Sequence, residues 1–212
     1  MRVIGLNSQR GKSGKDTLYD LIAADSVATK RFAFGDELKE KCSVAISYTE
    51  LMQKEMLIAM HDQTLKDEPM LILRGSNIAE SEYKTWLLVN GFDMTAPRSP
   101  RFHLQQYGNG YVRDYLNDED RWLNAVRSKL EYYPEATIVI TDVRQPNEVE
   151  WVRSIGGIVV RVKRGWDIPE VDNQPLHITD TALDSYGLPV IINEWGNPQG
   201  MLDQLKEVIN RE

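Results

Sequence analysis

The stretch from Arg10 to Leu18, RGKSGKDTL, constrains the fold of this chain more than any other. A short apolar run, Val3 to Leu6, precedes it, and apolar residues at helical spacing follow it, which predicts a buried strand, a glycine-rich turn and a helix. In that layout successive backbone N–H groups meet at a helix N-terminus, where unpaired donors and the helix dipole favour an anion. We predict a phosphate-binding loop, with Lys15 reaching the β- and γ-phosphates of a nucleotide. A surface turn rich in Gly and Lys is the alternative.

This loop departs from the usual pattern in two places. Gln9 stands where the first glycine is expected, and Gly11 is the candidate for a positive-φ position instead. Asp16 follows Lys15 where Ser or Thr is usual, but its carboxylate and the Thr17 hydroxyl both suit Mg²⁺, directly or through water. The residues expected at the phosphates of ATP are Gly11, Lys12, Ser13, Gly14, Lys15, Asp16 and Thr17.

Strand and helix patterns alternate along the rest of the chain. Strands are expected at 3–6, 31–34, 136–142, 158–162 and 190–192. This alternation predicts an α/β fold, a P-loop NTPase-type three-layer parallel sheet of about five strands with ligands at the strands' carboxyl ends. We expect a single P-loop domain over 1–212, with a helical insertion over 36–133.

Several helix ends are also predicted from local signals. A helix with Ser99 as N-cap and Pro100 at its first position is expected to end at Gly108. Asn147 is expected to cap the helix after the third strand, and the last helix is expected to start at Asn197 with Pro198 at its first position.

Composition excludes several classes of function. The net charge of −7 argues against binding to a nucleic-acid polymer, which needs a basic face. Apolar runs are far shorter than a membrane span, and the N-terminal residues lack a signal-peptide pattern. A single cysteine, Cys42, excludes an internal disulfide. A cytoplasmic protein is therefore expected.

The clearest strand, Ala136 to Asp142, ends on an acid. Magnesium bridging two phosphates needs such an acid on a strand beside the phosphate loop, although strand-end aspartates also serve as ordinary turn residues. Arg144 follows at the same edge, where its guanidinium could bind a phosphate bidentately or pair with Glu148.

Three arginines, Arg98, Arg101 and Arg113, lie close together in the predicted helical insertion. Their proximity in an acidic chain indicates an anion pocket, and solvated surface arginines are the alternative. The two histidines of this region, His61 and His103, are expected at the surface.

Four segments together resemble the deoxynucleoside monophosphate kinases of bacteriophages. They are GKSGKDT, SPRFHLQQYGNGYVRD (99–114), the Asp120-Arg121-Trp122 element and ITDVRQPNE (140–148). The resemblance runs from the phosphate loop to the last helix and is poor over about 61–98. It implies ATP and a deoxynucleoside monophosphate as substrates, Mg²⁺ as cofactor and a homodimer, in the host cytoplasm if the protein is phage-encoded.

The resemblance also implies which residues contact the acceptor nucleotide. They are Asp36, Lys39, Arg101, Gln105, Gly108, Trp122, Arg144 and Glu148, to which we add Arg98, Asn109 and Arg113. The family's Gly-Thr-Glu is Gly108-Asn109-Gly110 here, so base and sugar selectivity do not carry over. Its His-x-Ser-Glu pattern is His177 to Asp180 here.

The expected reaction is in-line transfer of the ATP γ-phosphoryl group to the 5′-phosphate of the acceptor. Lys15, Asp16, Asp142 and Arg144 are the expected catalytic residues, with Asp16, Thr17 and Asp142 around Mg²⁺. Residues 163–184 are the candidate lid, with Arg161 or Arg164 reaching ATP. The alternatives are a kinase for another small phosphorylated acceptor such as phosphomevalonate, a nucleotide-dependent switch or ATPase, and a non-catalytic binding module.

Overall fold

The computed structural model describes residues 2–26, 28–173 and 181–211. The chain divides into two compact units, described separately below. Unit 1 comprises Met1–Phe34 and Val126–Glu212, and unit 2 comprises Gly35–Ala125. Within the described ranges, no helix has the length and apolar character needed to cross a membrane.

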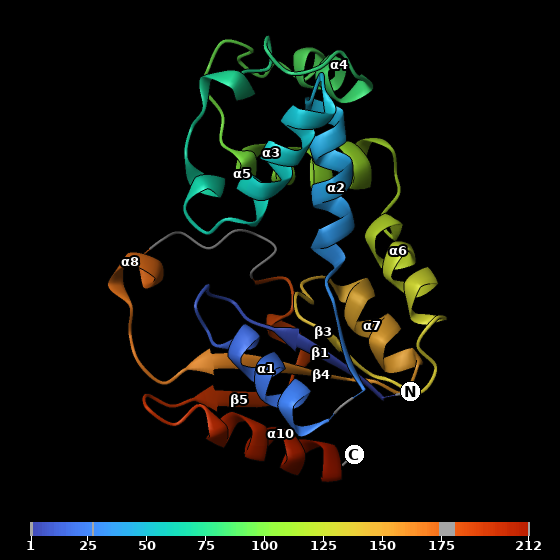
Figure 1. The fold of residues 1–212 in the computed structure, drawn as a ribbon, viewed down its shortest axis with the longest axis vertical. Helices are drawn as coiled ribbons and strands as arrows, with labels where there is room; N and C mark the ends of the chain where they lie inside the picture. Colours follow the sequence, from blue (N-terminus) through green and yellow to red (C-terminus); the bar gives the residue numbers. More distant parts are fainter. Residues whose placement is uncertain (1, 27, 174–180, 212) are drawn as a thin grey trace. The chain divides into compact units, whose positions relative to one another are not determined.

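Unit 1 is built on a five-stranded parallel sheet with the order β2-β3-β1-β4-β5 (Figure 1). The strands are β1 (Arg2–Asn7), β2 (Thr29–Phe32), β3 (Thr137–Ile140), β4 (Ile158–Arg164) and β5 (Val190–Asn193). The predicted second strand was therefore placed two residues too late. Each β-helix-β connection places consecutive strands in parallel, as the alternating pattern predicted.

Helices cover both faces of this sheet (Figure 1). Helices α1 (Lys15–Asp25) and α10 (Gln199–Arg211) bury Leu18, Met201 and Leu205 against Ile4 and Leu6 of β1. Helix α7 (Pro146–Ser154) packs against β1 and β4 and buries Val149 and Val152. The predicted three-layer α/β architecture of the P-loop NTPase type is confirmed.

Unit 2 is helical throughout its described elements. Its helices are α2 (Phe34–Ile46, whose first residue belongs to unit 1), α3 (Glu50–His61), α4 (Glu82–Val89), α5 (Pro100–Gln105) and α6 (Arg121–Leu130, which ends in unit 1). Short 3₁₀ turns lie at Leu65–Asp67 and Leu71–Leu73. The core of this unit surrounds Tyr83, whose ring lies 5.2 Å from that of Tyr107 and 5.7 Å from that of Tyr111. Cys42 is fully buried in unit 2, and this burial raises the pKa of its thiol, which keeps it protonated.

One helix of unit 2 continues where the sequence predicted that it would end. Helix α5 does not stop at Gly108 but runs on as a π-helix over Gln106–Tyr115. Gly108 lies against Leu38 of α2, where an added Cβ would meet the leucine side chain at 2.9 Å. The glycine is therefore explained by close helix packing and not by a helix end.

Two other helix starts differ from the prediction. Helix α7 has Gln145 as its N-cap and Pro146 at its first position, so Asn147 lies inside the helix. The last helix begins at Gln199, two residues after the predicted Asn197. The remaining described elements are α8 (Pro169–Asp172) and a 3₁₀ turn at Asp184–Tyr186.

Candidate active site

The loop that was predicted to bind phosphate, called the phosphate loop below, connects the carboxyl end of β1 to the first turn of α1. Gly14 is the N-cap of α1 with a φ of 101°, and it has no side chain that could cap the helix. The backbone N–H groups of the first helical turn point out of the helix N-terminus, where they can bind an anion. Lys12 also has a positive φ, 55°, whereas Gly11 does not. The expectation that Gly11 supplies the left-handed position is wrong, since Lys12 occupies it.

Side-chain hydrogen bonds of Lys15 and Asn193 hold this loop in place. The Lys15 ammonium donates to the Ser8 hydroxyl, so it folds back towards the end of β1. Asn193, at the end of β5, donates from Nδ2 to the Ser13 carbonyl at 3.2 Å. An alanine Cβ at Gly14 would lie 2.3 Å from that same Nδ2, so only glycine fits between the loop and Asn193.

Asp142 lies at the carboxyl end of β3, the strand next to β1. The β1–β3 register pairs Gly5 with Ile140. Two residues further along, Asp142 is therefore level with Asn7, the last residue of β1. The Asn7 amide donates to the Val143 carbonyl at 2.9 Å and joins the two strand ends. One Asp142 oxygen accepts a hydrogen bond of 2.8 Å from the Phe34 backbone N–H, which fixes the half-buried carboxylate.

Asp16 occupies the first turn of α1, with its side chain largely exposed. Its carboxylate pairs with the Arg31 guanidinium at 3.2 Å. Arg31 also donates to the Thr141 hydroxyl at 3.3 Å, so it connects the start of α1 with the residue before Asp142. Arg31 was not among the predicted site residues, because it lies in a short strand without a motif of its own.

The donor set at this edge suits a cation held jointly with phosphate. Among the described residues, no three His, Cys, Asp or Glu side chains cluster as a self-sufficient metal site. Mg²⁺ is usually held by one or two carboxylates together with substrate phosphates and water. Asp142, with Asp16 and Thr17 at the start of α1, fits that kind of coordination.

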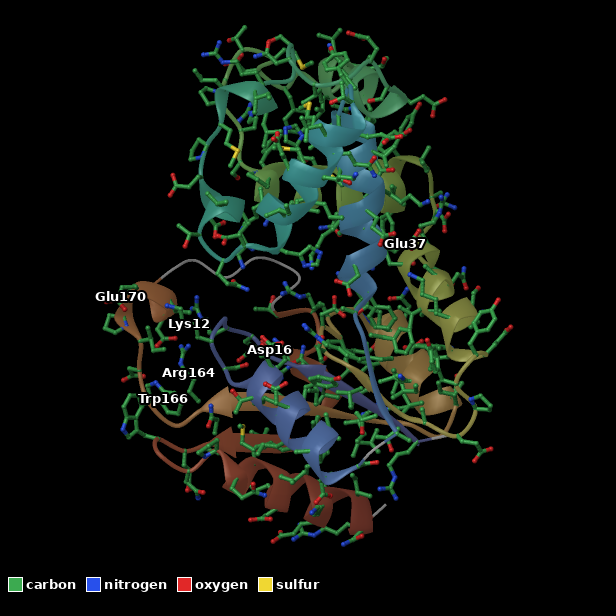
Figure 2. The ribbon with its side chains drawn as sticks, in the orientation of Figure 1. Lys12, Asp16, Glu37, Arg164, Trp166 and Glu170 are labelled. Atoms are coloured by element: carbon green, nitrogen blue, oxygen red, sulfur yellow. The ribbon has the colours of Figure 1, made fainter. Side chains whose placement is uncertain are left out.

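The segment after β4 is bonded to the phosphate loop. Arg164 donates to the Gly11 carbonyl at 2.7 Å and pairs with the Asp172 carboxylate. Arg10 donates to the Val171 carbonyl at 3.2 Å. Figure 2 shows Lys12, Arg164 and Trp166 along this edge of unit 1.

Arg161 is a buried residue of β4 that is in register with Asn7, the last residue of β1. It is 7% exposed and donates to Asn7 Oδ1 at 2.8 Å and to Asp184 Oδ1 at 2.8 Å. Asp184 also accepts a 2.6 Å hydrogen bond from Gln9. Within the described part of the chain, Nη2 of Arg161 is buried without a hydrogen-bond partner. The predicted His177 to Asp180 element, and residues 174–180 of the candidate lid, lie outside the described residues.

Arg144 and Glu148 interact through the backbone of the loop before α7. A Glu148 oxygen accepts hydrogen bonds from the backbone N–H groups of Arg144 and Gln145, at 2.7 and 3.0 Å. Glu148 is 3% exposed and acts as part of a capping box at the start of α7. The Arg144 side chain is exposed at the edge of the sheet.

In unit 2, the candidate acceptor residues from Arg98 to Arg113 lie on or beside one continuous helical run. Arg101 pairs with the Asp67 carboxylate through two guanidinium nitrogens, and this arginine lowers the pKa of Asp67. Arg98 stacks on the Phe102 ring at 4.4 Å. Gln105, Asn109 and Arg113 are half-buried along the same run.

The other candidate acceptor residues of unit 2 lie on α2 and α6. Lys39 pairs with Asp36 at 3.2 Å, and its ammonium lies 3.3 Å from Nδ1 of His61. His61 is exposed, as predicted. Trp122 is buried, and its indole N–H has no hydrogen-bond partner among the described residues.

His103 is fully buried, and the prediction that it lies at the surface is wrong. Its Nε2 lies 2.8 Å from the Leu73 carbonyl and its Nδ1 lies 3.1 Å from the Tyr83 hydroxyl. Because a carbonyl only accepts, Nε2 carries the proton and Nδ1 accepts from Tyr83. Burial lowers the pKa of the imidazole to about 4, against 6.5 for a free histidine.

The fold and the site together define a class of protein. A parallel sheet of order β2-β3-β1-β4-β5, a lysine-bearing phosphate loop after β1 and an aspartate at the end of the adjacent strand are the features of a P-loop NTPase-type α/β fold.

Comparison with known proteins gives one relative that is named as a kinase. No protein-family model matches the chain. The chain is 26% identical over 204 residues to an Acanthamoeba polyphaga mimivirus protein named "Putative deoxynucleotide monophosphate kinase". The match covers 92% of this chain and 90% of that protein, so it includes both units.

Proposed function

We propose that this protein is a deoxynucleoside monophosphate kinase, which transfers the γ-phosphoryl group of ATP to the 5′-phosphate of a deoxynucleoside monophosphate. The observation that carries the proposal is the placement of the Lys15 loop and Asp142 at the carboxyl ends of adjacent strands. The mimiviral relative is named as a deoxynucleotide monophosphate kinase, which supports a deoxynucleotide as the acceptor. Resemblance of the 99–114 and 140–148 segments to the phage kinases supports it independently of that relative.

The phosphate loop would hold the donor. Lys15 and the backbone N–H groups at the start of α1 would neutralise the β- and γ-phosphates, while Gly11, Lys12 and Ser13 would supply further backbone contacts. Magnesium, when bound, neutralises charge between these phosphates, and Asp142, Asp16 and Thr17 are the groups suited to hold it. Positioning and charge neutralisation dominate such a transfer, because the acceptor phosphate arrives already ionised.

The acceptor would be held by the arginines and the helical residues. Arg144 at the sheet edge is suited to the acceptor phosphate, because its exposed guanidinium can bind two phosphate oxygens. In unit 2, Arg101 forms a bidentate pair with the Asp67 carboxylate. An acceptor phosphate would compete with this carboxylate for the Arg101 guanidinium. The remaining proposed acceptor contacts are Asp36, Lys39, Arg98, Gln105, Gly108, Asn109, Arg113, Trp122 and Glu148.

Residues 163–184 would act as the lid. Arg164 and Asp172 already connect this segment to the phosphate loop through the Gly11 carbonyl. A phosphate oxygen is a stronger acceptor for Arg164 than a backbone carbonyl, so donor binding would draw this arginine towards ATP. Exclusion of water by such a segment prevents hydrolysis of ATP.

Product analysis tests the proposal. ATP with Mg²⁺ is incubated with each of the four deoxynucleoside monophosphates and their ribose counterparts, and diphosphates are separated by ion-exchange chromatography. We expect ADP and a nucleoside diphosphate in equal amounts, and neither with Lys15→Ala. ADP with free phosphate only would contradict the proposal and favour an ATPase. No nucleoside diphosphate in these reactions, but phosphoryl transfer in a parallel reaction with phosphomevalonate, would favour the other kinase class.

A further inference from the structure

A cavity opens beside the phosphate loop on the side of β5. It has a volume of about 650 Å³, within the usual range for small-molecule sites. Residues 12–17 of the loop and α1 form one wall, and residues 193–196, Pro198 and Trp166 form the other. All of these residues belong to unit 1.

Two tryptophans dominate the wall facing the loop. Trp166 follows β4 and Trp195 follows β5, and because these strands are parallel neighbours their following segments emerge side by side. The indole rings lie edge to face, with centroids 5.2 Å apart and planes at 84°. Trp195 is 80% exposed, so most of its large apolar face has no cover in the described structure. An exposed tryptophan that lines a cavity can bury apolar area against a ligand.

The distance between the phosphate loop and these tryptophans is set by hydrogen bonds. Asn193, two residues before Trp195, donates to the Ser13 carbonyl at 3.2 Å and is itself 8% exposed. Arg164 donates to the Trp166 carbonyl at 3.3 Å and to the Gly11 carbonyl at 2.7 Å. Both tryptophan-bearing segments are therefore bonded to the phosphate loop itself.

We propose that Trp195 stacks on the nucleobase of the donor triphosphate, with Trp166 contacting the edge of the base, while the loop holds its phosphates. The proposal rests on the proposed function for the identity of the ligand. A ligand with phosphates at one end and a flat heterocycle at the other matches a cavity with anion-binding amides on one wall and indoles on the other. Every base has a π-face, so stacking supplies affinity without a base-specific hydrogen bond.

The test compares a ligand that has a base with one that has none. Binding of ATP–Mg²⁺ and of inorganic tripolyphosphate–Mg²⁺ is measured by isothermal titration calorimetry, without any acceptor. For Trp195→Ala we expect the Kd for ATP to rise about five- to tenfold, the lower part of the range for base–aromatic stacking, because the indole is largely exposed. The Kd for tripolyphosphate should not change, and Trp195→Phe should recover most of the ATP affinity.

Tyr132→Ala is the matched control, because Tyr132 is 81% exposed and lies outside the cavity. It should leave both affinities unchanged. Equal weakening of ATP and tripolyphosphate by Trp195→Ala, or unchanged ATP binding in both Trp195→Ala and Trp166→Ala, would overturn the proposal.

This result is separable from the kinase assignment. Wild-type protein that binds ATP more tightly than tripolyphosphate, with the difference removed by Trp195→Ala, supports the base site even if no acceptor is phosphorylated. Kinase activity in a protein that binds both ligands equally would retain the proposed function and refute the base site.

Discussion

The buried imidazole of His103 should make the stability of this protein fall steeply in mild acid. In the fold it has a pKa of about 4, because burial disfavours the charged form, whereas in the unfolded chain it has a pKa near 6.5. As the pH falls below 6.5, the unfolded chain binds a proton that the folded chain does not. The stabilisation is therefore complete above pH 6.5 and is lost as the pH falls towards 4.

The expected size follows from the two pKa values. At about 1.4 kcal/mol per pH unit, the free energy of unfolding falls by about 3 kcal/mol between pH 6.5 and pH 4 through this group alone. Carboxyl groups titrate in the same range, so the comparison needs a variant that differs only at this position. His103→Gln retains a donor for the Leu73 carbonyl and an acceptor for the Tyr83 hydroxyl, but does not titrate.

Urea unfolding of both proteins, followed by circular dichroism from pH 7 to pH 4, measures the difference. Hydrogen exchange of unit 2 peptides reports the unit that contains His103. We expect the wild type to lose about 3 kcal/mol more than His103→Gln across this range. Parallel losses in the two proteins, or an imidazole NMR titration of His103 above pH 6, would refute the reasoning.

Three further substitutions test the site and the packing. Lys15→Ala should lower kcat/KM for phosphoryl transfer about 100-fold or more with little change in Tm, because it removes charge from the phosphates and not from the core; turnover near wild type would contradict its role. Arg144→Ala should raise the acceptor KM about tenfold while the Kd of ATP stays constant, and an unchanged acceptor KM and kcat would remove Arg144 from the acceptor site. Gly108→Ala should destabilise unit 2 by about 1–3 kcal/mol in urea unfolding, because its Cβ would lie 2.9 Å from the Leu38 side chain, and a variant of wild-type stability would show that Leu38 relaxes freely.

The parallel sheet could be predicted because its strands are apolar and buried on both faces. Val139 and Ile140 are fully buried, and such runs separated by helical periodicity leave few alternatives. The loop between β1 and α1 could be predicted from local sequence as well, because Gly14 and Lys15 follow an apolar strand and precede a helix.

Features that depend on tertiary packing were not predictable from local sequence. Gly108 has the identity of a helix terminator, and only the approach of Leu38 shows why the helix continues through it. His103 has a polar side chain, and its burial depends on Tyr83 and Leu73, which lie 20 and 30 residues away in the sequence.

The tryptophan-lined wall of the cavity could not be predicted for a similar reason. Trp166 and Trp195 are 29 positions apart in the numbering and belong to no motif, but adjacent strands bring them within 5.2 Å of each other. A tryptophan two residues after the end of each of two neighbouring strands is the signal that could have indicated this wall.

The bonds between the phosphate loop and residues 163–184 have a thermodynamic consequence. Gln9 and Gly11 each bond to side chains of that segment, Asp184 and Arg164 respectively. A ligand whose affinity for the loop differs between the bonded and the broken state of these hydrogen bonds shifts their equilibrium by that difference in free energy. By reciprocity, breaking the bonds changes the affinity of the loop for the ligand by the same factor.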